Sequence, residues 1–250
     1  MSAETTSVVL VTGSATGVGR ATAVRFAKLG YTVVVNYSRS EEDARETVRL
    51  VEAAGQRALL VRCDVSDEPQ VLRMIETIDE ELGRLDVLVN NAATTAFVPH
   101  RELDLMTTPD WDRILNVNLK GPFYCTRAAV PMLRASGQGA VVNVSSVAGI
   151  AGQGSSIAYC ASKGALNTMT KSLAVALAPE IRVNAVCPGP IDSRWLRSVM
   201  SEADLLARTA DFPIPRPAQP DDITDAIVYL ATGTSLTPGQ RLVVDGGRTM

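Results

Sequence analysis

Short apolar runs alternate along this chain with longer segments of helical spacing, and this alternation restricts the fold more than any other feature. The runs are rich in Val, Ile and Leu and lie at 8–11, 32–35, 58–61, 85–89, 140–144, 181–186 and 242–244. Helical spacing is predicted at 17–29, 41–54, 67–82, 110–136, 157–178 and 221–231. Strands that are apolar on both faces are typical of parallel sheets covered on both sides. The pattern therefore predicts an α/β fold with a doubly wound, seven-stranded parallel sheet and helices on both faces.

One segment, at about 188–220, is rich in proline and polar residues and has no such period. Because it is too long for a tight connection, we expect either a functional lid or a small helical insertion. No linker-like run, repeat or low-complexity segment interrupts the rest of the chain. Residues 1–250 are therefore predicted to form one domain that carries a lid insertion at about 190–220.

Charge and composition exclude several classes of function. The chain has 24 Lys and Arg against 27 Asp and Glu, a formal net charge of −3, so a nucleic-acid partner is not expected. The one histidine, His100, cannot build a multi-histidine metal site, and no metal is expected. The four cysteines lie far apart, which fits a reducing compartment. No run approaches the ~20 apolar residues of a membrane helix, and no secretion signal is visible, so we expect a soluble cytoplasmic protein.

A glycine-rich turn follows the first apolar run and precedes a helical segment. Gly13, Gly17 and Gly19 have the spacing G-x-x-x-G-x-G. Glycine lets the backbone approach a phosphate closely, and the N-terminus of the following helix offers free N–H groups. The spacing differs from the usual dinucleotide G-x-G-x-x-G, and a turn that serves only tight packing is the alternative. Its position between a strand and a helix favours phosphate binding.

The residues after the second run bear on the choice of cofactor. An Asp or Glu is common here in sites for NAD, where it binds the ribose 2′-hydroxyl, whereas a nearby Arg suits a 2′-phosphate. No acid occurs between Val33 and Ser40, but Ser38 and Arg39 are present. The alternative is that Arg39 is a solvated surface charge. The pattern favours NADP(H) over NAD(H).

Tyr159 and Lys163 have the i, i+4 spacing that places two side chains on one face of a helix. A cation beside a phenol favours the phenolate, so we expect Lys163 to lower the pKa of Tyr159 and to let it exchange a proton near neutral pH. The alternative is an ordinary pair of surface neighbours. Ser146, at the end of the fifth run, is predicted to lie on the same side of the sheet and favours a catalytic group.

Eight short motifs occur in order along the chain: T-G-S-A-T-G-V-G at 12–19, C-D-V at 63–65, N-N-A-A at 90–93, N-V-N-L at 116–119, V-S-S at 144–146, Y-C-A-S-K at 159–163, V-N-A-V-C-P-G-P-I-D-S at 183–193 and V-D-G-G at 244–247. Through them the chain resembles the classical short-chain dehydrogenase/reductase family along nearly its whole length. It is most similar to the branch of 3-oxoacyl-carrier-protein reductases and glucose or polyol dehydrogenases. The resemblance implies a single NAD(P)-binding Rossmann domain.

The resemblance also implies roles for individual residues. Ser146, Tyr159 and Lys163 would form the catalytic trio, with Asn118 as a fourth member that fixes a helix irregularity and a proton-relaying water. The resemblance implies that Gly13, Gly17 and Gly19 line the pyrophosphate, that Asp64 and Val65 flank the adenine, that Asn91 and Ala92 lie at a ribose, and that Pro188, Gly189, Ile191 and Ser193 hold the nicotinamide amide. Ser14, Ala15, Thr16, Val18, Tyr159 and Lys163 are also implied to bind the cofactor. Ala93 departs from the family's usual glycine.

The expected function is NADP(H)-dependent interconversion of a ketone and a secondary alcohol, most like a 3-oxoacyl-carrier-protein reductase. A sugar, polyol or steroid dehydrogenase that uses NAD or NADP is the alternative, and a cofactor-sensing regulator without catalysis is the third reading. The resemblance implies a small-molecule carbonyl or alcohol substrate and a homotetramer or dimer, built from the helices at 110–136 and 157–178, with no nucleic-acid or membrane partner. Apolar residues of the lid, among them Trp195, Leu196 and Met200, could cover substrate or pack on a neighbouring subunit.

Overall fold

All seven strands of the central sheet run parallel, and the structure, a computed structural model, describes residues 6–250. The strands are β1 (Val8–Val11), β2 (Thr32–Tyr37), β3 (Ala58–Arg62), β4 (Val87–Asn90), β5 (Gly139–Val144), β6 (Ile181–Pro188) and β7 (Arg241–Val244). Their order is β3-β2-β1-β4-β5-β6-β7, so the direction of winding reverses between β1 and β4. The predicted doubly wound sheet is confirmed, and ligands of such sheets bind where the winding reverses.

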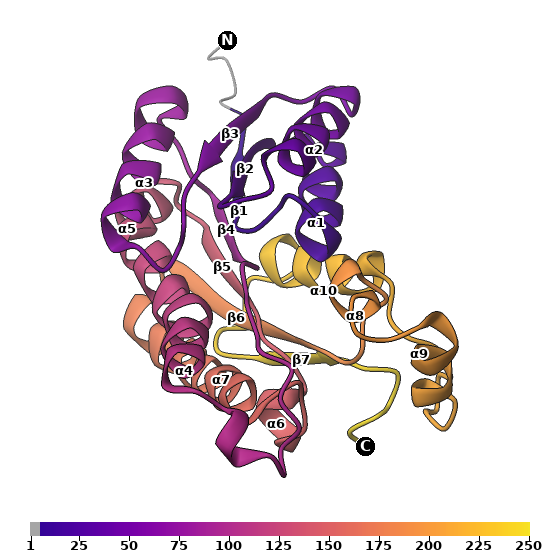
Figure 1. Ribbon diagram of the computed structural model, residues 1–250. Coiled ribbons are helices and arrows are strands. Elements are labelled where there is room, and N and C mark those ends of the chain that lie inside the picture. The colour runs from indigo at the N-terminus through magenta and orange to yellow at the C-terminus, as the bar shows by residue number, and fades with distance from the viewer. Residues whose placement is uncertain (1–5) are drawn as a thin grey trace.

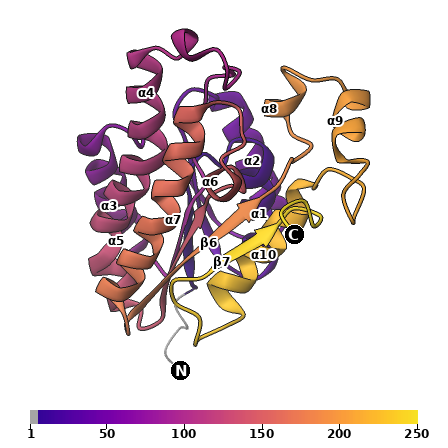
Figure 2. The same cartoon turned by 90° about the horizontal axis from the view of Figure 1, so that it is seen from below.

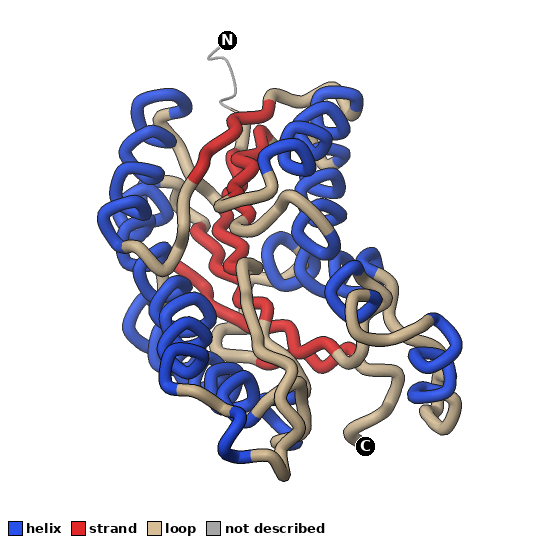
Figure 3. The backbone as a smooth tube through the Cα atoms, viewed as in Figure 1, coloured by secondary structure: helices blue, strands red, loops and turns tan. Residues whose placement is uncertain are grey.

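Helices cover the sheet on both faces (Figures 1 and 3). They are α1 (Gly17–Lys28), α2 (Glu41–Ala53), α3 (Glu68–Leu82), α4 (Thr108–Leu115), α5 (Gly121–Ala135), α6 (Ala148–Ala151), α7 (Ile157–Leu177), α8 (Arg194–Arg197), α9 (Glu202–Thr209) and α10 (Pro220–Thr232), with short segments η1 (Leu103–Leu105) and η2 (Asn116–Lys120). One layer holds α1, α2 and α10, and the other holds α3, α4, α5 and α7. None of these helices within residues 6–250 is long and apolar enough to cross a lipid bilayer.

Alternating side chains of each central strand enter two separate cores. In β1, Val9 and Val11 pack in the core beneath α1 and α10, whereas Val8 and Leu10 pack in the core beneath α3 and α5. All four are at most 2% exposed. Burial of one such side chain stabilises the fold by roughly 1.5–3 kcal/mol, so a strand buried on both faces is held from both sides.

The edge strand β7 departs from the prediction. Its apolar run indicated a strand covered on both faces, but Leu242 is 36% and Val243 is 39% exposed. β7 pairs only with β6 and ends the sheet. In the single chain, this edge therefore keeps an apolar surface in contact with solvent.

The helix predicted at 110–136 is not continuous. It is divided into α4, the π-helical segment η2 and α5. A single π-helical turn arises where a helix must accommodate a local insertion, and such turns often occur at functional sites. Here the fully buried Asn118 lies within the turn.

The segment at 188–220 is the small helical insertion that was one of the two expectations. Figures 1 and 2 show its helices α8 and α9 set apart from both helical layers. An isolated bridge between Ile191 and Ala218 joins the two ends of the insertion. Arg194 of α8 makes a bidentate ion pair with Asp43 of α2, at 2.8 and 2.9 Å. The insertion is thus fastened to the helical layer that carries α2.

Candidate active site

A cavity of about 760 Å³ opens at the carboxyl ends of the strands. Most residues predicted to bind cofactor or substrate line it, namely Gly13, Thr16, Gly17, Val18, Ser38, Arg39, Asp64, Val65, Asn91, Ala92, Ser146, Tyr159, Lys163, Pro188, Gly189, Ile191 and Ser193. Ser14, Ala15, Gly19 and Asn118 do not line it. The topology therefore gathers segments from across the chain into one site.

The glycine turn leaves open backbone at the start of α1. Gly17 has a positive φ of 58°, and a Cβ built on it would meet nothing within 4 Å, so the backbone there faces open space in the cavity. The capping residue Thr16 makes no side-chain hydrogen bond to the first turn of α1. N–H groups of that turn remain available at the positive end of the helix dipole, an arrangement that suits a phosphate.

Behind this open face the turn is tightly packed. A Cβ on Gly19 would lie 2.5 Å from Asn91 Nδ2 and equally close to the carbonyl oxygen of Gly13. Asn91 Nδ2 donates hydrogen bonds to the carbonyl oxygens of Thr12, at 2.8 Å, and of Gly13, at 3.1 Å. Gly19 thus serves the close packing of α1, and Asn91 fastens the turn to the end of β4.

Asn36 is a site residue that the sequence did not single out. Its Oδ1 accepts from the Gly13 N–H at 3.0 Å, and its Nδ2 donates to the carbonyl oxygen of Cys63 at 3.1 Å. Its own N–H donates to Ser14 Oγ at 3.0 Å. Ser14 is fully buried, and its hydroxyl supports the turn, so its contact with the cofactor stays a prediction. The sequence feature that could have pointed to Asn36 is its polar side chain, which directly follows a run of β-branched residues.

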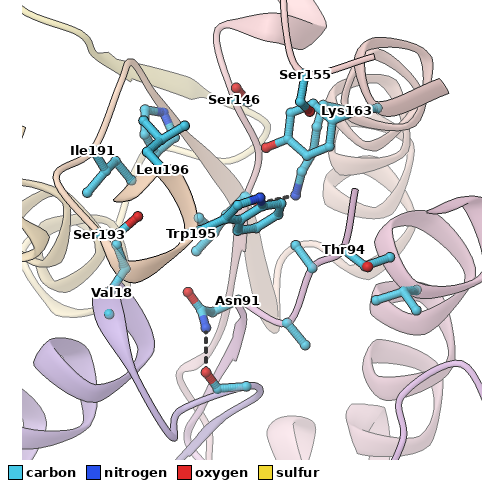
Figure 4. Close-up of a pocket in the computed structure, with 18 of the residues that line it drawn as sticks. Val18, Asn91, Thr94, Ser146, Ser155, Lys163, Ile191, Ser193, Trp195 and Leu196 are labelled. Carbon is cyan, nitrogen blue, oxygen red and sulfur yellow. Dashed lines mark hydrogen bonds between the residues drawn. The ribbon is translucent and has the colours of Figure 1, made fainter. Parts of the chain in front are cut away.

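Ser146, Tyr159 and Lys163 meet at the end of β5 and the first turns of α7. Figure 4 shows Ser146, Lys163 and Trp195 around one cavity, with Val18 and Asn91 toward α1. The Ser156 hydroxyl accepts from the Tyr159 N–H at 3.2 Å and starts α7 at this point. Lys163 Nζ donates to the carbonyl oxygen of Val144 at 2.7 Å and lies 5.8 Å from the centre of the Tyr159 ring. The N-cap Ser156 fixes the start of α7, and the i, i+4 spacing places Tyr159 and Lys163 on the helix face that lies toward the sheet.

Burial, and not the neighbouring cation, dominates the pKa of Tyr159. Burial raises this pKa to about 12, against a smaller opposing effect of the Ser146 hydroxyl. Burial also lowers the pKa of Lys163 to about 8. The expectation that the pKa of Tyr159 falls toward neutral pH is therefore wrong for this structure. At pH 7 Tyr159 holds its proton and can donate it.

Asn118 joins three elements behind the cavity wall. Its Oδ1 accepts from the Thr94 N–H at 2.8 Å, and its Nδ2 donates to the Thr94 carbonyl oxygen at 2.9 Å and to Ser162 Oγ at 3.1 Å. The side chain thus connects η2, the loop after β4 and α7. A catalytic role for Asn118 stays a prediction. Its hydrogen bonds show a structural role as a clamp, which here means that it holds the loop after β4 and α7 together.

Replacing Asn118 with alanine is expected to lower the free energy of unfolding by about 1–3 kcal/mol, because the backbone groups of Thr94 would lose their partners in a buried setting. Urea unfolding followed by circular dichroism measures the change. Asn118→Asp is the matched variant, since its carboxylate retains an acceptor for the Thr94 N–H but cannot donate to the carbonyl. A loss below 0.5 kcal/mol in the alanine variant would contradict the clamp.

At the end of β2 the cavity offers an unpaired cation. Ser38 and Arg39 are exposed and line it, and no ion pair of Arg39 occurs within residues 6–250. After the end of β3, the Asp64 carboxylate accepts from the N–H and hydroxyl of Ser66, at 3.0 and 2.6 Å. The residues present fit the adenosine end of a dinucleotide, with a positive charge where a 2′-phosphate would lie.

The opposite wall is formed by the segment that leads into the insertion. A Cβ on Gly189 would lie 2.9 Å from Asp245 Cα, so only glycine lets β6 and the C-terminal segment approach this closely. Trp195 of α8 makes an edge contact with the Tyr159 ring, with centroids 6.0 Å apart and planes at 78°. The insertion therefore touches the proposed proton donor. Further lining residues had no motif to reveal them, namely Thr94, Phe97, Arg113, Gln153, Ser155, Arg208 and Arg248.

Comparisons with known proteins agree with this geometry. A family model described as enoyl-(acyl carrier protein) reductase matches residues 13–249. A granaticin polyketide synthase ketoacyl reductase 2 of Streptomyces violaceoruber is 44% identical, over 96% of this chain and 95% of the relative. A cis-4-hydroxycyclohexanecarboxylate dehydrogenase of Sinomonas cyclohexanicum is 40% identical, over 97% and 96%.

Two solved structures have the same fold at high coverage. A structure described as that of a short-chain dehydrogenase/reductase from Burkholderia xenovorans has a TM-score of 0.92 at 37% identity, and the match covers 98% of each chain. An acetoin dehydrogenase from Enterobacter cloacae has a TM-score of 0.86 at 36% identity, over 98% of this chain and 96% of that one.

Proposed function

We propose a specific reaction for this chain, which belongs to the short-chain dehydrogenase/reductase family and is an oxidoreductase acting on carbonyl and alcohol groups. The reaction is NADP(H)-dependent interconversion of a ketone and a secondary alcohol, most like that of a 3-oxoacyl-carrier-protein reductase. One observation carries the proposal: a single cavity holds the open glycine turn together with Ser146, Tyr159 and Lys163. Support for the acyl substrate comes from the ketoacyl reductase that is 44% identical.

When bound, the dihydronicotinamide supplies the hydride that reduces the carbonyl carbon. Tyr159, which is neutral at pH 7 because burial raises its pKa, donates its hydroxyl proton to the carbonyl oxygen. Ser146 donates a hydrogen bond to the same oxygen and stabilises the negative charge that develops there. The Lys163 ammonium, 5.8 Å from the Tyr159 ring centre, stabilises the phenolate that remains. Below about pH 8 this lysine carries its charge, so the trio is poised for reduction at neutral pH.

Initial-rate kinetics on a panel of ketones and alcohols test the proposal, each with NADPH and with NADH. The panel contains a 3-oxoacyl thioester, 4-oxocyclohexanecarboxylate, acetoin, a sugar and a simple secondary alcohol. We expect the highest kcat/KM for the 3-oxoacyl thioester with NADPH. A sugar or polyol that reacts fastest with NAD would replace this function with the alternative dehydrogenase. Tight cofactor binding without turnover on any member would identify a regulator.

Arg39 is proposed to select the phosphorylated cofactor. A charge-assisted hydrogen bond to phosphate contributes roughly 1.5–3 kcal/mol. Replacing Arg39 with glutamine is therefore expected to lower the ratio of kcat/KM for NADPH to that for NADH by about 10–100-fold. The matched control is Arg45→Gln, because Arg45 is exposed on α2, pairs with Glu41 and does not line the cavity. A ratio that stays within twofold of the parent value would show that Arg39 is only a solvated charge.

We also propose a cytoplasmic homotetramer, with a dimer as the alternative. All four cysteines are free and buried, which fits a reducing compartment. Val175 on α7 is 83% exposed, Phe123 on α5 is 37% exposed, and the edge strand β7 is apolar and open. Light scattering coupled to size exclusion is expected to give four times the chain mass of 26.6 kDa. A monomer at micromolar concentration would overturn the proposal.

A further inference from the structure

The charged residues that line the cavity are almost all positive. Among the described residues they are Arg39, Arg113, Lys163, Arg194, Arg208 and Arg248, against Asp64 alone. The chain as a whole carries a net charge of −3, so this concentration of cations is local. A cleft lined by one sign of charge attracts ligands of the opposite sign. More positive charge is present than the cofactor site described above requires.

Four of the six cations are already explained. Arg113 pairs with the carboxylate of Asp110 at 3.0 Å, and Arg194 pairs with Asp43 at 2.8 Å. Lys163 belongs to the catalytic trio, and Arg39 lies at the adenosine end of the cofactor site. Arg208 and Arg248 remain, and within residues 6–250 neither makes an ion pair.

The fold brings these two arginines together from separate segments. Arg208 lies in the last turn of α9, and Arg248 lies beyond β7. Their segments are joined where the Ile214 N–H donates to the Gly246 carbonyl oxygen at 2.9 Å, and where a Cβ on Gly247 would lie 2.7 Å from the Pro213 ring. Burial lowers the pKa of Arg248, and the positive charge of Arg208 lowers it further. The two segments that carry the arginines are thus joined, and both arginines line the same cavity.

Within residues 6–250, no carboxylate makes an ion pair with either arginine. Asp245 acts on Arg248 through its charge, but its oxygens accept hydrogen bonds from the Gly247 N–H and from the N–H and hydroxyl of Thr249. The contact that Arg248 makes is with Gln153 Oε1, at 3.5 Å. Gln153 belongs to the loop that leads into α7 and also lines the cavity. The arginine pair therefore stands beside the loop that precedes Tyr159.

We propose that Arg208 and Arg248 bind an anionic group of the substrate, a carboxylate or a phosphate, while its ketone lies at Tyr159. This inference rests on the proposed function and specifies its substrate class. Guanidinium groups present paired donors that match the oxygens of either anion. An anion between them replaces repulsion with two attractions, and the insertion that carries Arg208 is drawn toward the C-terminal segment.

Matched pairs of ketones test the inference and separate the two anions. The carboxylate pair is 4-oxocyclohexanecarboxylate and its methyl ester. The phosphate pair is the acetoacetyl thioester of 4′-phosphopantetheine and that of pantetheine. For the parent protein and for Arg208→Gln and Arg248→Gln, the readout is the ratio of kcat/KM for the charged to that for the neutral member of a pair. The control is Arg73→Gln, since Arg73 is exposed on α3 and does not line the cavity.

We expect the parent to prefer the charged member of at least one pair by tenfold or more. Either glutamine variant should lower that ratio about tenfold, whereas the control leaves it unchanged. The pair that shows the effect identifies the anion. If the parent reduces charged and neutral members equally, or if both variants keep the parent ratio, the inference is overturned while the proposed function stands. If no member of either pair is reduced, the proposed function itself fails.

Discussion

Replacing Tyr159 with phenylalanine is expected to lower kcat for ketone reduction by about 10²–10⁴-fold, the usual contribution of a positioned proton donor. Phenylalanine keeps the ring that packs against Trp195 and removes only the hydroxyl, so the fold should persist. Cofactor binding should also persist, because the open glycine turn is untouched. The measurements are steady-state kinetics and a fluorescence titration with NADPH.

The control for this variant is Tyr229→Phe. Tyr229 lies on α10, is 50% exposed and does not line the cavity, so its hydroxyl should have no effect on turnover. A Tyr159→Phe enzyme that reduces ketones at the parent rate would remove Tyr159 from the reaction. Loss of NADPH binding in that variant would instead indicate that the hydroxyl mainly holds the cofactor.

Replacing Lys163 with methionine is expected to lower turnover about 10²-fold and at the same time to stabilise the fold. Lys163 Nζ lies 5.8 Å from the centre of the Tyr159 ring. Opposite unit charges about 6 Å apart attract by on the order of 3 kcal/mol at an effective dielectric constant of about 20, and the variant loses this stabilisation of the phenolate. The buried ammonium, however, costs free energy of folding, as its lowered pKa indicates. An apolar side chain of similar length should therefore raise the free energy of unfolding by on the order of 1–3 kcal/mol at pH 7.

The stability difference should depend on pH in a defined direction. In the unfolded chain Lys163 titrates near 10.5, whereas in the folded protein burial lowers its pKa to about 8. Between these values the unfolded state binds more protons, so the stability of the parent rises with pH. The advantage of Lys163→Met should be largest below pH 8 and should shrink toward pH 10.5. Urea unfolding at pH 7, 8 and 9 measures it, and an advantage that grows with pH would refute a buried ammonium.

Regular periodicity made most of the fold predictable. The runs that begin at Val8 and Thr32 became buried strands because their alternate side chains enter two cores. The apolar pattern of β7 does not show whether the chain itself covers both faces of the strand. It therefore could not reveal that Leu242 stays exposed at the edge of the sheet. Periodicity also predicted one helix at 110–136, because it does not reveal the hydrogen bonds between Asn118 in the π-helical turn and the distant Thr94.

Those parts of the site whose residues lie close together in the sequence could be predicted from their spacing. Tyr159 and Lys163 are four residues apart on one helix, and the glycine turn is contiguous, so both were found from the sequence. Arg208 and Arg248 come from segments that only the folded chain joins, and neither lies in a motif. The pKa of Tyr159 was expected to fall because the cation was counted without the burial of the phenol. Desolvation depends on the whole fold and is not encoded in spacing.

The edge contact between Trp195 and Tyr159 allows the position of the insertion to be followed by tryptophan fluorescence. The chain has only two tryptophans, Trp111 and Trp195, and Trp195 alone lines the cavity. A Trp111→Phe background would leave one indole as an intrinsic emitter beside the proposed proton donor. Opening of α8 would move that indole from a phenol edge into water, and its emission would shift to the red. The motion of the insertion could thus be timed in a stopped-flow instrument without any attached dye.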